Sequence, residues 1–245
     1  MKAVALELAS FTYAHGALCL NLQTPEGVPA FNLRVPNHLV EQAVRGGVAE
    51  LQRAQFEILE RLAVTAEHRD GRTAEHTRRV GRLSALVADA IGWPAGQVEL
   101  IGCAARLHDI GKIGIPESIL LKPHALTAQE FEMLRAHTRI GASILAGSSL
   151  PLLQMAEKIA LTHHERWDGT GYTPGFRGQV IPQCGRIVAL VDVFDALTHE
   201  RPYKEAWPID RAIDWIQRGR GLHFDPSLVD AFVSLSPTDL LSDAA

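Results

Sequence analysis

From residue 73 onward, apolar residues recur every three or four positions, the spacing that gathers them on one face of an α-helix. Val80, Leu83 and Val87 form one such face, and Gly92 with Pro94 ends that helix. Strands would instead alternate apolar and polar residues at every second position. The sequence therefore predicts a mainly α fold, a helical bundle around one core.

Further helices are predicted from residues that favour helix starts and from the glycines and prolines between the helices. The next apolar face is expected to run on to a histidine, through Val98, Ile101, Ala105 and His108. Other helices are expected to open at the capping box of Thr127 and Glu130 and at Pro151, and to cover 185–198, 208–218 and 226–234. Residues 165–183 contain four glycines and two prolines, which predicts a loop.

The N-terminal part differs in pattern. Val4, Leu6 and Leu8 alternate with small or polar residues, and two further apolar runs, 17–22 and 30–35, flank a turn at residues 24–27. Asn37 can cap a long helix that reaches about residue 68. We therefore expect a small β-rich segment (1–36), a linking helix that is also a candidate dimerisation helix (37–68) and a helical domain (69–245).

The long helix carries a heptad-like seam, formed by Val44, Val48, Leu51, Gln55, Ile58 and Leu62. Two interpretations remain open. The helix can lie on its own domain as an ordinary amphipathic helix, or it can pair with a second copy to form a homodimer, with Gln55 helping to set the register.

The net charge and the cysteine content limit the expected binding partners and the expected cellular compartment. The net charge of −4 gives no general attraction to DNA or to anionic membranes, so a bound phosphate must be drawn by a local site. The three cysteines have no C-x-x-C spacing, which indicates free thiols in a reducing compartment, the cytoplasm. The apolar run at 187–197 is interrupted by Asp192 and Asp195, so no membrane span is expected.

Histidines accompanied by aspartates form the main chemical signal. His108-Asp109 and His163-His164 are adjacent pairs at predicted helix ends, whereas His76, His137 and Asp192 belong to separate helices. First-row divalent metals such as iron and manganese accept mixed imidazole and carboxylate ligands. Two ions about 3.5–4 Å apart need a bridging carboxylate, and an aspartate beside a histidine can supply it.

A single histidine on a helix is more often a core or surface residue than a ligand. We therefore leave six histidines out of the predicted site: His15, His38, His68, His124, His199 and His223. Seven candidate ligands, five histidines and two aspartates, spread over several helices are harder to explain without metal, because a buried cluster of that composition is costly to desolvate.

Four separated motifs carry a family resemblance. The chain has His-Asp-Ile-Gly-Lys at 108–112, His-His-Glu-Arg-Trp-Asp-Gly-Thr-Gly-Tyr at 163–172, Val-Asp-Val-Phe-Asp-Ala-Leu-Thr at 191–198 and Arg-Pro-Tyr-Lys at 201–204. Together they resemble the HD-GYP branch of the HD-domain phosphohydrolases, over roughly residues 68–235. The resemblance implies an HD-domain helical bundle with iron or manganese and no organic cofactor. It also implies hydrolysis of cyclic dinucleotides, chiefly cyclic di-GMP, to pGpG and/or GMP.

The resemblance also implies roles for individual residues. The metal ligands are His76, His108, Asp109, His137, His163, His164 and Asp192, with Asp109 as the bridge. Lys112 acts with Asp109 in catalysis by contacting the scissile phosphate. Substrate contacts are expected at Asp70, Gly171, Tyr172, Arg201 and Lys204. Asp168 is expected to brace the glycine loop, and Asp195 to be structural.

Two positions depart from the family pattern. Some members have a glutamate four residues before the first histidine that supports a third metal, but here that residue is Arg72. Arginine cannot bind a cation, so two ions are expected. In the loop, Thr173 stands where the family has proline, which leaves the choice of dinucleotide and of partner proteins at this loop open.

Three functions remain open from the sequence. The first is hydrolysis of cyclic di-GMP. The second is hydrolysis of another substrate, such as cyclic GMP-AMP or a nucleotide monoester. The third is a catalytically weak or silent module that binds cyclic di-GMP and signals through protein contacts.

Overall fold

The structure is a computed structural model that describes residues 7–14, 17–68, 74–172, 175–200 and 205–241. The chain divides into two compact units, Met1–Glu57 and Ile58–Ala245. The helix α1, Asn37–His68, continues across that division.

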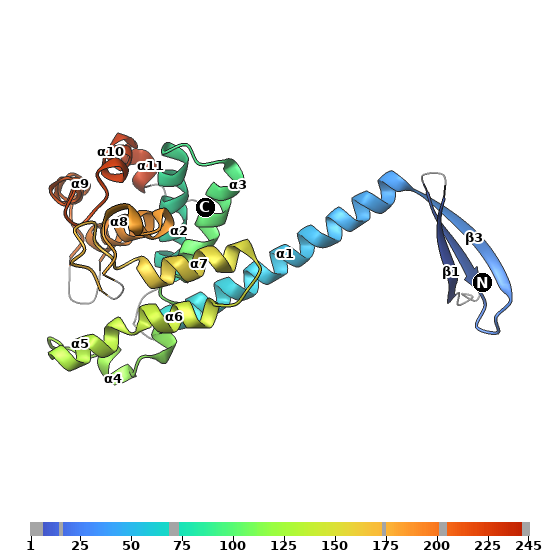
Figure 1. The fold of residues 1–245 in the computed structure, drawn as a ribbon, viewed down its shortest axis with the longest axis horizontal. Coiled ribbons are helices and arrows are strands. Elements are labelled where there is room, and N and C mark those ends of the chain that lie inside the picture. The colour runs from blue at the N-terminus through green and yellow to red at the C-terminus, as the bar shows by residue number, and fades with distance from the viewer. Residues whose placement is uncertain (1–6, 15–16, 69–73, 173–174, 201–204, 242–245) are drawn as a thin grey trace. The chain divides into compact units, whose positions relative to one another are not determined.

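The first unit contains three antiparallel strands in the order β1-β2-β3 and the first part of α1 (Figure 1). The strands are β1 (Glu7–Ala14), β2 (Ala17–Gln23) and β3 (Pro29–Pro36). The turn between β2 and β3 is closed by the amide of Gly27, which donates to the carbonyl of Thr24 at 2.8 Å. Gly27 has a φ of +81°, a conformation that side chains disfavour. The predicted second and third strands and their turn are confirmed, whereas Val4 and Leu6 lie outside the described residues.

The second unit is helical. Its helices are α2 (Ala74–Ala90), α3 (Ala95–Ala104), α4 (Glu117–Leu120), α5 (Ala128–Arg135), α6 (His137–Leu145), α7 (Pro151–Thr162), α8 (Gln183–Thr198), α9 (Ile209–Arg218), α10 (Pro226–Ser234) and α11 (Pro237–Leu241). Short 3₁₀ turns cover Ala105–Leu107, Ile110–Gly114 and Gly178–Val180. The predicted mainly α bundle with a small β-rich N-terminal segment and a long following helix is confirmed.

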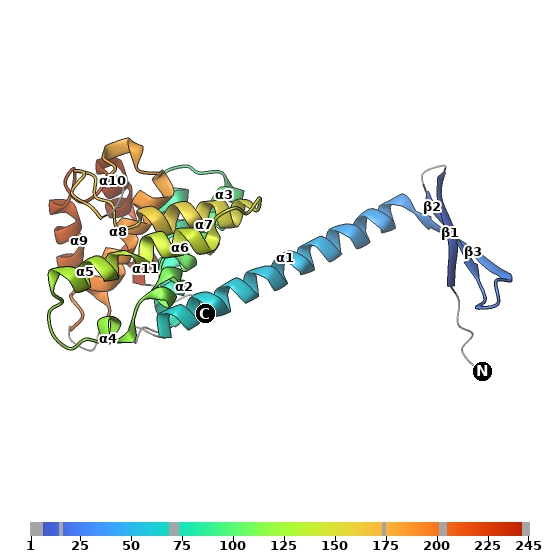
Figure 2. The same ribbon diagram turned by 60° about the horizontal axis from the view of Figure 1, so that its bottom comes forward.

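Helix α8 lies at the centre of this unit (Figures 1 and 2). It packs against α2, α7, α9 and α10, and most of its side chains are buried. A helix that is apolar nearly all round is stable only when neighbours cover it on every side. Asp192 and Asp195 are the acidic exceptions, so this helix carries two carboxylates into the interior.

One expected helix ends earlier than predicted. Residues 98–108 were expected to form one helical face, but α3 ends at Ala104 and the chain tightens into a 3₁₀ turn. The amide of His108 accordingly donates to Ala105, three residues back, at 3.2 Å. The prediction that His108 lies on the α-helix is wrong because periodicity alone does not distinguish a tightened last turn from a regular one.

No helix within the described ranges is both long and apolar enough to cross a lipid bilayer.

Candidate metal centre

The seven predicted metal ligands come from five separate stretches of the second unit and meet in its interior. His76 lies on α2, His137 opens α6 and Asp192 lies on α8. His108 and Asp109 lie in the turn between α3 and α4, and His163 and His164 directly follow α7. All but His164 are buried.

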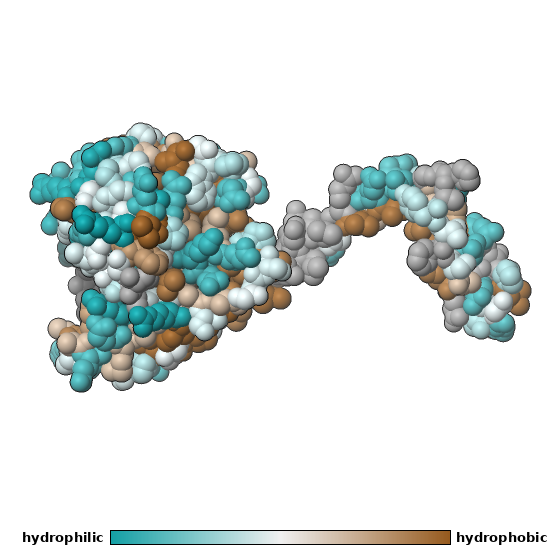
Figure 3. Space-filling model, in the orientation of Figure 1, coloured by the Kyte–Doolittle hydropathy of each residue, from teal (hydrophilic) through white to brown (hydrophobic). Residues whose placement is uncertain are grey.

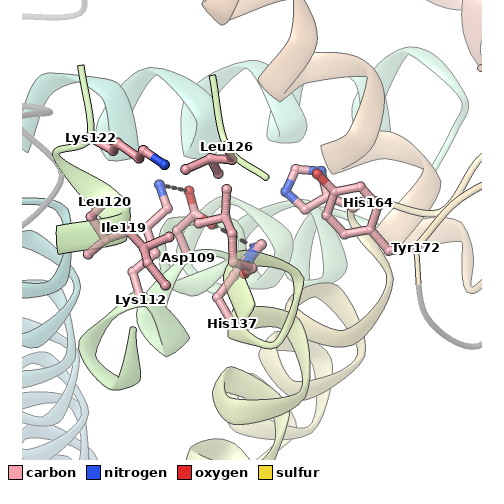
Figure 4. Close-up of a pocket in the computed structure, with 10 residues that line it drawn as sticks. Asp109, Lys112, Ile119, Leu120, Lys122, Leu126, His137, His164 and Tyr172 are labelled. Carbon is pink, nitrogen blue, oxygen red and sulfur yellow. Dashed lines mark hydrogen bonds and ion pairs between the residues drawn. The ribbon is translucent and has the colours of Figure 1, made fainter. Parts of the chain in front are cut away.

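Asp109 stands between two sets of imidazoles. Its Oδ1 lies 3.3 Å from Nε2 of His137 and 3.5 Å from Nε2 of His163. Its Oδ2 lies 3.3 Å from Nε2 of His108. Figure 4 shows Asp109 with its two oxygens turned toward different neighbours, one of them His137. Such a carboxylate can bind two ions at once.

The ligand atoms separate into two groups that share Asp109. In each group, all ligand atoms lie within 4.8 Å of one another. The first group contains Asp109, His137, His163 and His164, and the second contains Glu67, His76, His108 and Asp109. Asp192 lies beside the second group, with Oδ1 3.5 Å from Nε2 of His76 and 4.0 Å from Nε2 of His108.

Hydrogen bonds from Nδ1–H to backbone carbonyls orient several imidazoles toward the centre. Nδ1 of His108 lies 2.9 Å from the carbonyl oxygen of Ala105, and Nδ1 of His137 lies 2.7 Å from that of Leu134. Nδ1 of His163 contacts the carbonyls one turn back in α7 at 3.1 Å. With Nδ1–H donating to a carbonyl, Nε2 keeps its lone pair for a metal.

Close backbone packing brings the two halves of the site together. A Cβ added at Gly111 would lie 1.9 Å from the carbonyl oxygen of His137 and 2.4 Å from the amide nitrogen of Gly141. Any side chain at position 111 would therefore push α6 away from the turn that carries Asp109. The glycine of the His-Asp-Ile-Gly-Lys motif thus allows Asp109 and His137 to approach each other.

The electrostatics of the centre favour an anionic carboxylate at Asp109 and neutral imidazoles at His137 and His164, whereas His108 is shifted the other way. Burial by itself raises the pKa of Asp109, but Lys112 and His108 outweigh it and hold the pKa well below its usual range. Burial lowers the pKa of His137 to about 4, and burial together with His163 lowers that of His164 well below its ordinary value. For His108, burial is outweighed by Asp109, which raises the pKa to about 9.

The donor set fits divalent first-row ions. Imidazole nitrogens and carboxylate oxygens are the ligand types that iron and manganese accept. The Nε2 atom of His108 is buried and has no hydrogen-bond partner among the described residues. Unsatisfied buried polar atoms are rare in folded proteins, and an ion between these side chains would satisfy this one.

Lys112 lies on one side of the centre, and its Nζ is 2.6 Å from Oδ2 of Asp109. A pocket opens over this pair (Figure 4). Its polar lining includes His137, His164 and Lys122, and its apolar lining consists of Ile119, Leu120, Leu126 and Leu134. Neither Lys122 nor these apolar residues were predicted from the sequence, because nothing in their local pattern relates them to the metal ligands.

The glycine loop packs back onto the centre through Gly171 and Tyr172. A Cβ at Gly171 would lie 2.6 Å from the amide nitrogen of Arg166 and 2.9 Å from the carbonyl oxygen of His164. The Tyr172 ring lies 4.5 Å from the His164 ring, and Tyr172 also lines the pocket. Asp168 braces the loop as expected, accepting hydrogen bonds from Arg166 and from the amide of Thr170.

Several predicted positions lie outside the described residues. They are the substrate contacts Asp70, Arg201 and Lys204, and the two departures from the family pattern, Arg72 and Thr173.

Two acidic residues take part in the site in ways that the sequence did not fully indicate. Glu67, in the last turn of α1, belongs to the second ligand group but was counted with the linking helix. The feature that could have identified it is its position four residues after Ala63, which places the two side chains on the same face of the helix. Both are buried in the structure. Asp195, expected to be structural, lies with Oδ2 2.6 Å from Nδ1 of His76 and accepts from Nε of Arg79 at 2.6 Å.

Comparisons with known proteins identify the family of this chain. The sequence pattern of the family described as HD domain matches residues 60–228. A Thermotoga maritima protein named cyclic di-GMP phosphodiesterase is 47% identical over 197 residues, covering 80% of this chain and 54% of that protein. A Vibrio cholerae protein named 3'3'-cGAMP-specific phosphodiesterase 2 is 39% identical over 183 residues, covering 75% of this chain and 35% of that protein.

The fold has a counterpart among solved structures. The crystal structure of a cyclic GMP-AMP specific phosphodiesterase of Vibrio cholerae matches with a TM-score of 0.58 at 19% identity, covering 77% of this chain and 51% of that one. The chain thus spans about half or less of the length of these three proteins. Since the family pattern covers more than half of the 245 residues, and since the motif residues 108–112 and 163–172 meet at one buried centre, this chain belongs to the HD domain family, in its HD-GYP branch.

Proposed function

We propose that this chain is a metal-dependent phosphodiesterase that hydrolyses a cyclic dinucleotide, with cyclic di-GMP as the first candidate and pGpG and/or GMP as products. The observation that carries the proposal is the position of Asp109, between two imidazole groups and beside Lys112, below an open pocket. The names of the relatives, of which the Thermotoga maritima protein is a cyclic di-GMP phosphodiesterase, support the same substrate class.

The proposed metal ligands are the seven predicted residues, His76, His108, Asp109, His137, His163, His164 and Asp192. Two ions, iron or manganese, are proposed because two ligand groups share one carboxylate. When bound, such a pair polarises a phosphoryl oxygen and activates a water for in-line attack.

The residues around the centre have separate proposed roles. Asp109 holds both ligand groups together, and Lys112 places a cation beside the scissile phosphate, where it stabilises developing negative charge. The apolar side chains Ile119, Leu120 and Leu126 exclude water from one side of the pocket. Tyr172 and Gly171 are proposed to contact the substrate, and Asp70, Arg201 and Lys204 to bind its more distant parts.

A second substrate is supported by one observation. The Vibrio cholerae relative at 39% identity is named as specific for 3'3'-cGAMP, so relatives of this chain are named for two different dinucleotides. Cyclic GMP-AMP is therefore the alternative substrate.

A homodimer through α1 is part of the proposal, as are protein partners at the glycine loop and a cytoplasmic location. The dimer is supported by three exposed apolar side chains of the predicted seam on α1, Val44, Ile58 and Leu62. Apolar surface is also visible on the part of α1 that follows the strands (Figure 3). Apolar side chains repeated along a helix face and left exposed are typical of an interface.

The test is anaerobic purification, metal quantification and product analysis with cyclic di-GMP and cyclic GMP-AMP side by side. We expect turnover of cyclic di-GMP with Fe(II) or Mn(II), and none with the double variant H108A/D109A. Faster turnover of cyclic GMP-AMP would favour the alternative substrate. Tight binding of cyclic di-GMP by fully metal-loaded protein without turnover would indicate a binding module instead of an enzyme.

A further inference from the structure

Glu67 is a buried acid at the edge of the metal centre. It lies in the last turn of α1, on the same face as the buried Ala63, and only 1% of its surface is exposed. Acidic side chains are almost never buried to this degree unless they are paired or bind a metal. The burial of Glu67 therefore calls for a partner.

The described residues do not supply a hydrogen bond to that carboxylate. Both of its oxygens are buried, and neither has a hydrogen-bond partner among the described residues. Lys112 is a cation close to it, with Nζ 4.0 Å from Oε1 of Glu67. That Nζ lies much closer to Asp109, at 2.6 Å. An ion pair at 4.0 Å leaves most of the desolvation of the Glu67 carboxylate uncompensated.

The position of the carboxylate indicates what compensates it. One oxygen of Glu67 lies within 4.8 Å of ligand atoms of His76, His108 and Asp109, and these atoms are equally close to one another. We infer that Glu67 is itself a metal-binding residue and supplies a carboxylate to the ion held by His76 and His108. This inference rests on the metal centre of the proposed function, and it adds a ligand beyond the seven assigned there.

With Glu67, the two ion positions differ in chemistry. The first has three imidazoles and one carboxylate, from His137, His163, His164 and Asp109. The second has two imidazoles and as many as three carboxylates, from His76, His108, Asp109, Asp192 and Glu67. Imidazole suits iron and zinc, whereas carboxylate oxygen suits manganese and magnesium. The second position is therefore the one expected to take manganese in preference to zinc.

The test compares Glu67→Gln with a matched variant on the same helix, Glu60→Gln. Glu60 lies seven residues earlier and is paired with Arg78 and Arg106 at 3.2 and 2.9 Å, so it has no role at the centre. Metal-free protein comprising all 245 residues is titrated with Mn(II) alone, and bound ions are counted by mass spectrometry and by manganese paramagnetic resonance. We expect two ions for the unmodified chain and for E60Q. In E67Q, one of the two ions should bind at least about tenfold more weakly or be lost, because loss of a ligand costs no less affinity than loss of a ligand's hydrogen-bond partner, about 10–100-fold.

Thermal unfolding gives a second readout that does not depend on turnover. Without metal, E67Q should unfold at the same or a higher temperature than the unmodified chain, because a buried charge has been removed. E60Q should unfold at a lower temperature, because it loses an ion pair. On addition of Mn(II), the gain in unfolding temperature should be smaller for E67Q than for the other two proteins.

Each outcome has a separate meaning. Equal affinity and stoichiometry in E67Q and the unmodified chain would overturn the inference and leave Glu67 as a partner of Lys112 only. Absence of metal binding in the unmodified chain would instead overturn the proposed metal centre. Should E67Q fail to fold, Glu67→Asp keeps the charge and withdraws the carboxylate by one methylene. Unchanged manganese affinity in that variant would equally overturn the role of Glu67.

Discussion

The ammonium group of Lys112 lies 2.6 Å from Oδ2 of Asp109, three residues earlier in the same turn, and both side chains are buried. The other oxygen of Asp109 is directed to His137 and His163. One carboxylate thus joins the imidazole cluster to the lysine, and both residues line the same pocket.

Lys112→Met should lower kcat about 10²–10³-fold, because a preorganised cation beside the developing charge is lost, whereas bound metal per chain should stay the same. The matched control is Lys122→Met. Lys122 lines the same pocket, but its Nζ is held by Glu130 at 2.6 Å. Steady-state kinetics with metal quantification separates the two variants. Loss of metal in K112M, or equal losses of kcat in both, would contradict the assigned role of Lys112.

Asp109→Asn should remove both ions, because the neutral amide keeps the shape of the side chain but not the charge or the second acceptor oxygen that two ligand groups share. We expect less than one ion per chain and no measurable turnover. Asp89→Asn, at an exposed position on α2, is the control and should keep two ions. A D109N protein that retained two tightly bound ions would show that Asp109 does not bridge them.

Asp195→Asn should weaken metal binding without removing a ligand. Burial by itself raises the pKa of Asp195, but hydrogen bonds from His76 and Arg79 outweigh it and lower the pKa to about 2. The carboxylate of Asp195 therefore holds the His76 ring so that Nδ1 points to Asp195 and Nε2 points to Asp192. Loss of such a partner costs about 10–100-fold in metal affinity. Titration of metal-free D195N with Mn(II) checks this, and an unchanged affinity would leave Asp195 with a structural role only.

His223 should make the fold less stable at mildly acidic pH. Burial, helped by the nearby Arg166, lowers its pKa to about 4 from an ordinary value of 6.5. Between pH 6.5 and 4 the unfolded chain binds a proton that the folded chain does not. The free energy of unfolding therefore falls as the pH falls, by at most about 1.4 kcal/mol per pH unit.

The variant His223→Phe checks this by removing the titration, while an aromatic ring remains to stack on Phe224, as the His223 ring does at 4.2 Å. Urea unfolding of chelator-treated protein at pH 7 and pH 5 should show a smaller loss of stability for H223F than for the unmodified chain. The same loss in both proteins would mean that His223 does not contribute.

The double variant Ile58→Glu/Leu62→Glu should convert the proposed dimer into a monomer. Both side chains are about half exposed, at 59% and 48%, so the substitutions should leave the second unit folded. Charges introduced at a seam repel each other when two copies of the helix pair. Light scattering measures the mass, and circular dichroism controls for folding. An unmodified chain that is already monomeric would contradict the dimer.

Local sequence signals determined most of the element boundaries. The capping box of Thr127 and Glu130 opens α5 as predicted, with the side chain of each residue bonded to the backbone of the other. Pro151 opens α7, and α1 covers Asn37–His68 as expected. These features depend on hydrogen bonds and side-chain spacing within one or two turns of chain, so they can be read without knowledge of distant residues.

The sequence by itself also determined the list of seven candidate ligands, because their residue types and motifs mark them. Only the tertiary structure decided how they group. The sharing of Asp109 by two ligand groups, the pairing of Asp195 with Arg79 and His76, and the burial of Glu67 beside His108 all join residues far apart in the chain. Such contacts depend on where helices cross, and these crossings are set by close approaches such as that of Gly111 to the backbone of α6. No local pattern encodes the position of a crossing. The sequence therefore places Glu67 correctly in the long helix α1 but does not show that its carboxylate reaches the ligand atoms of His76 and His108.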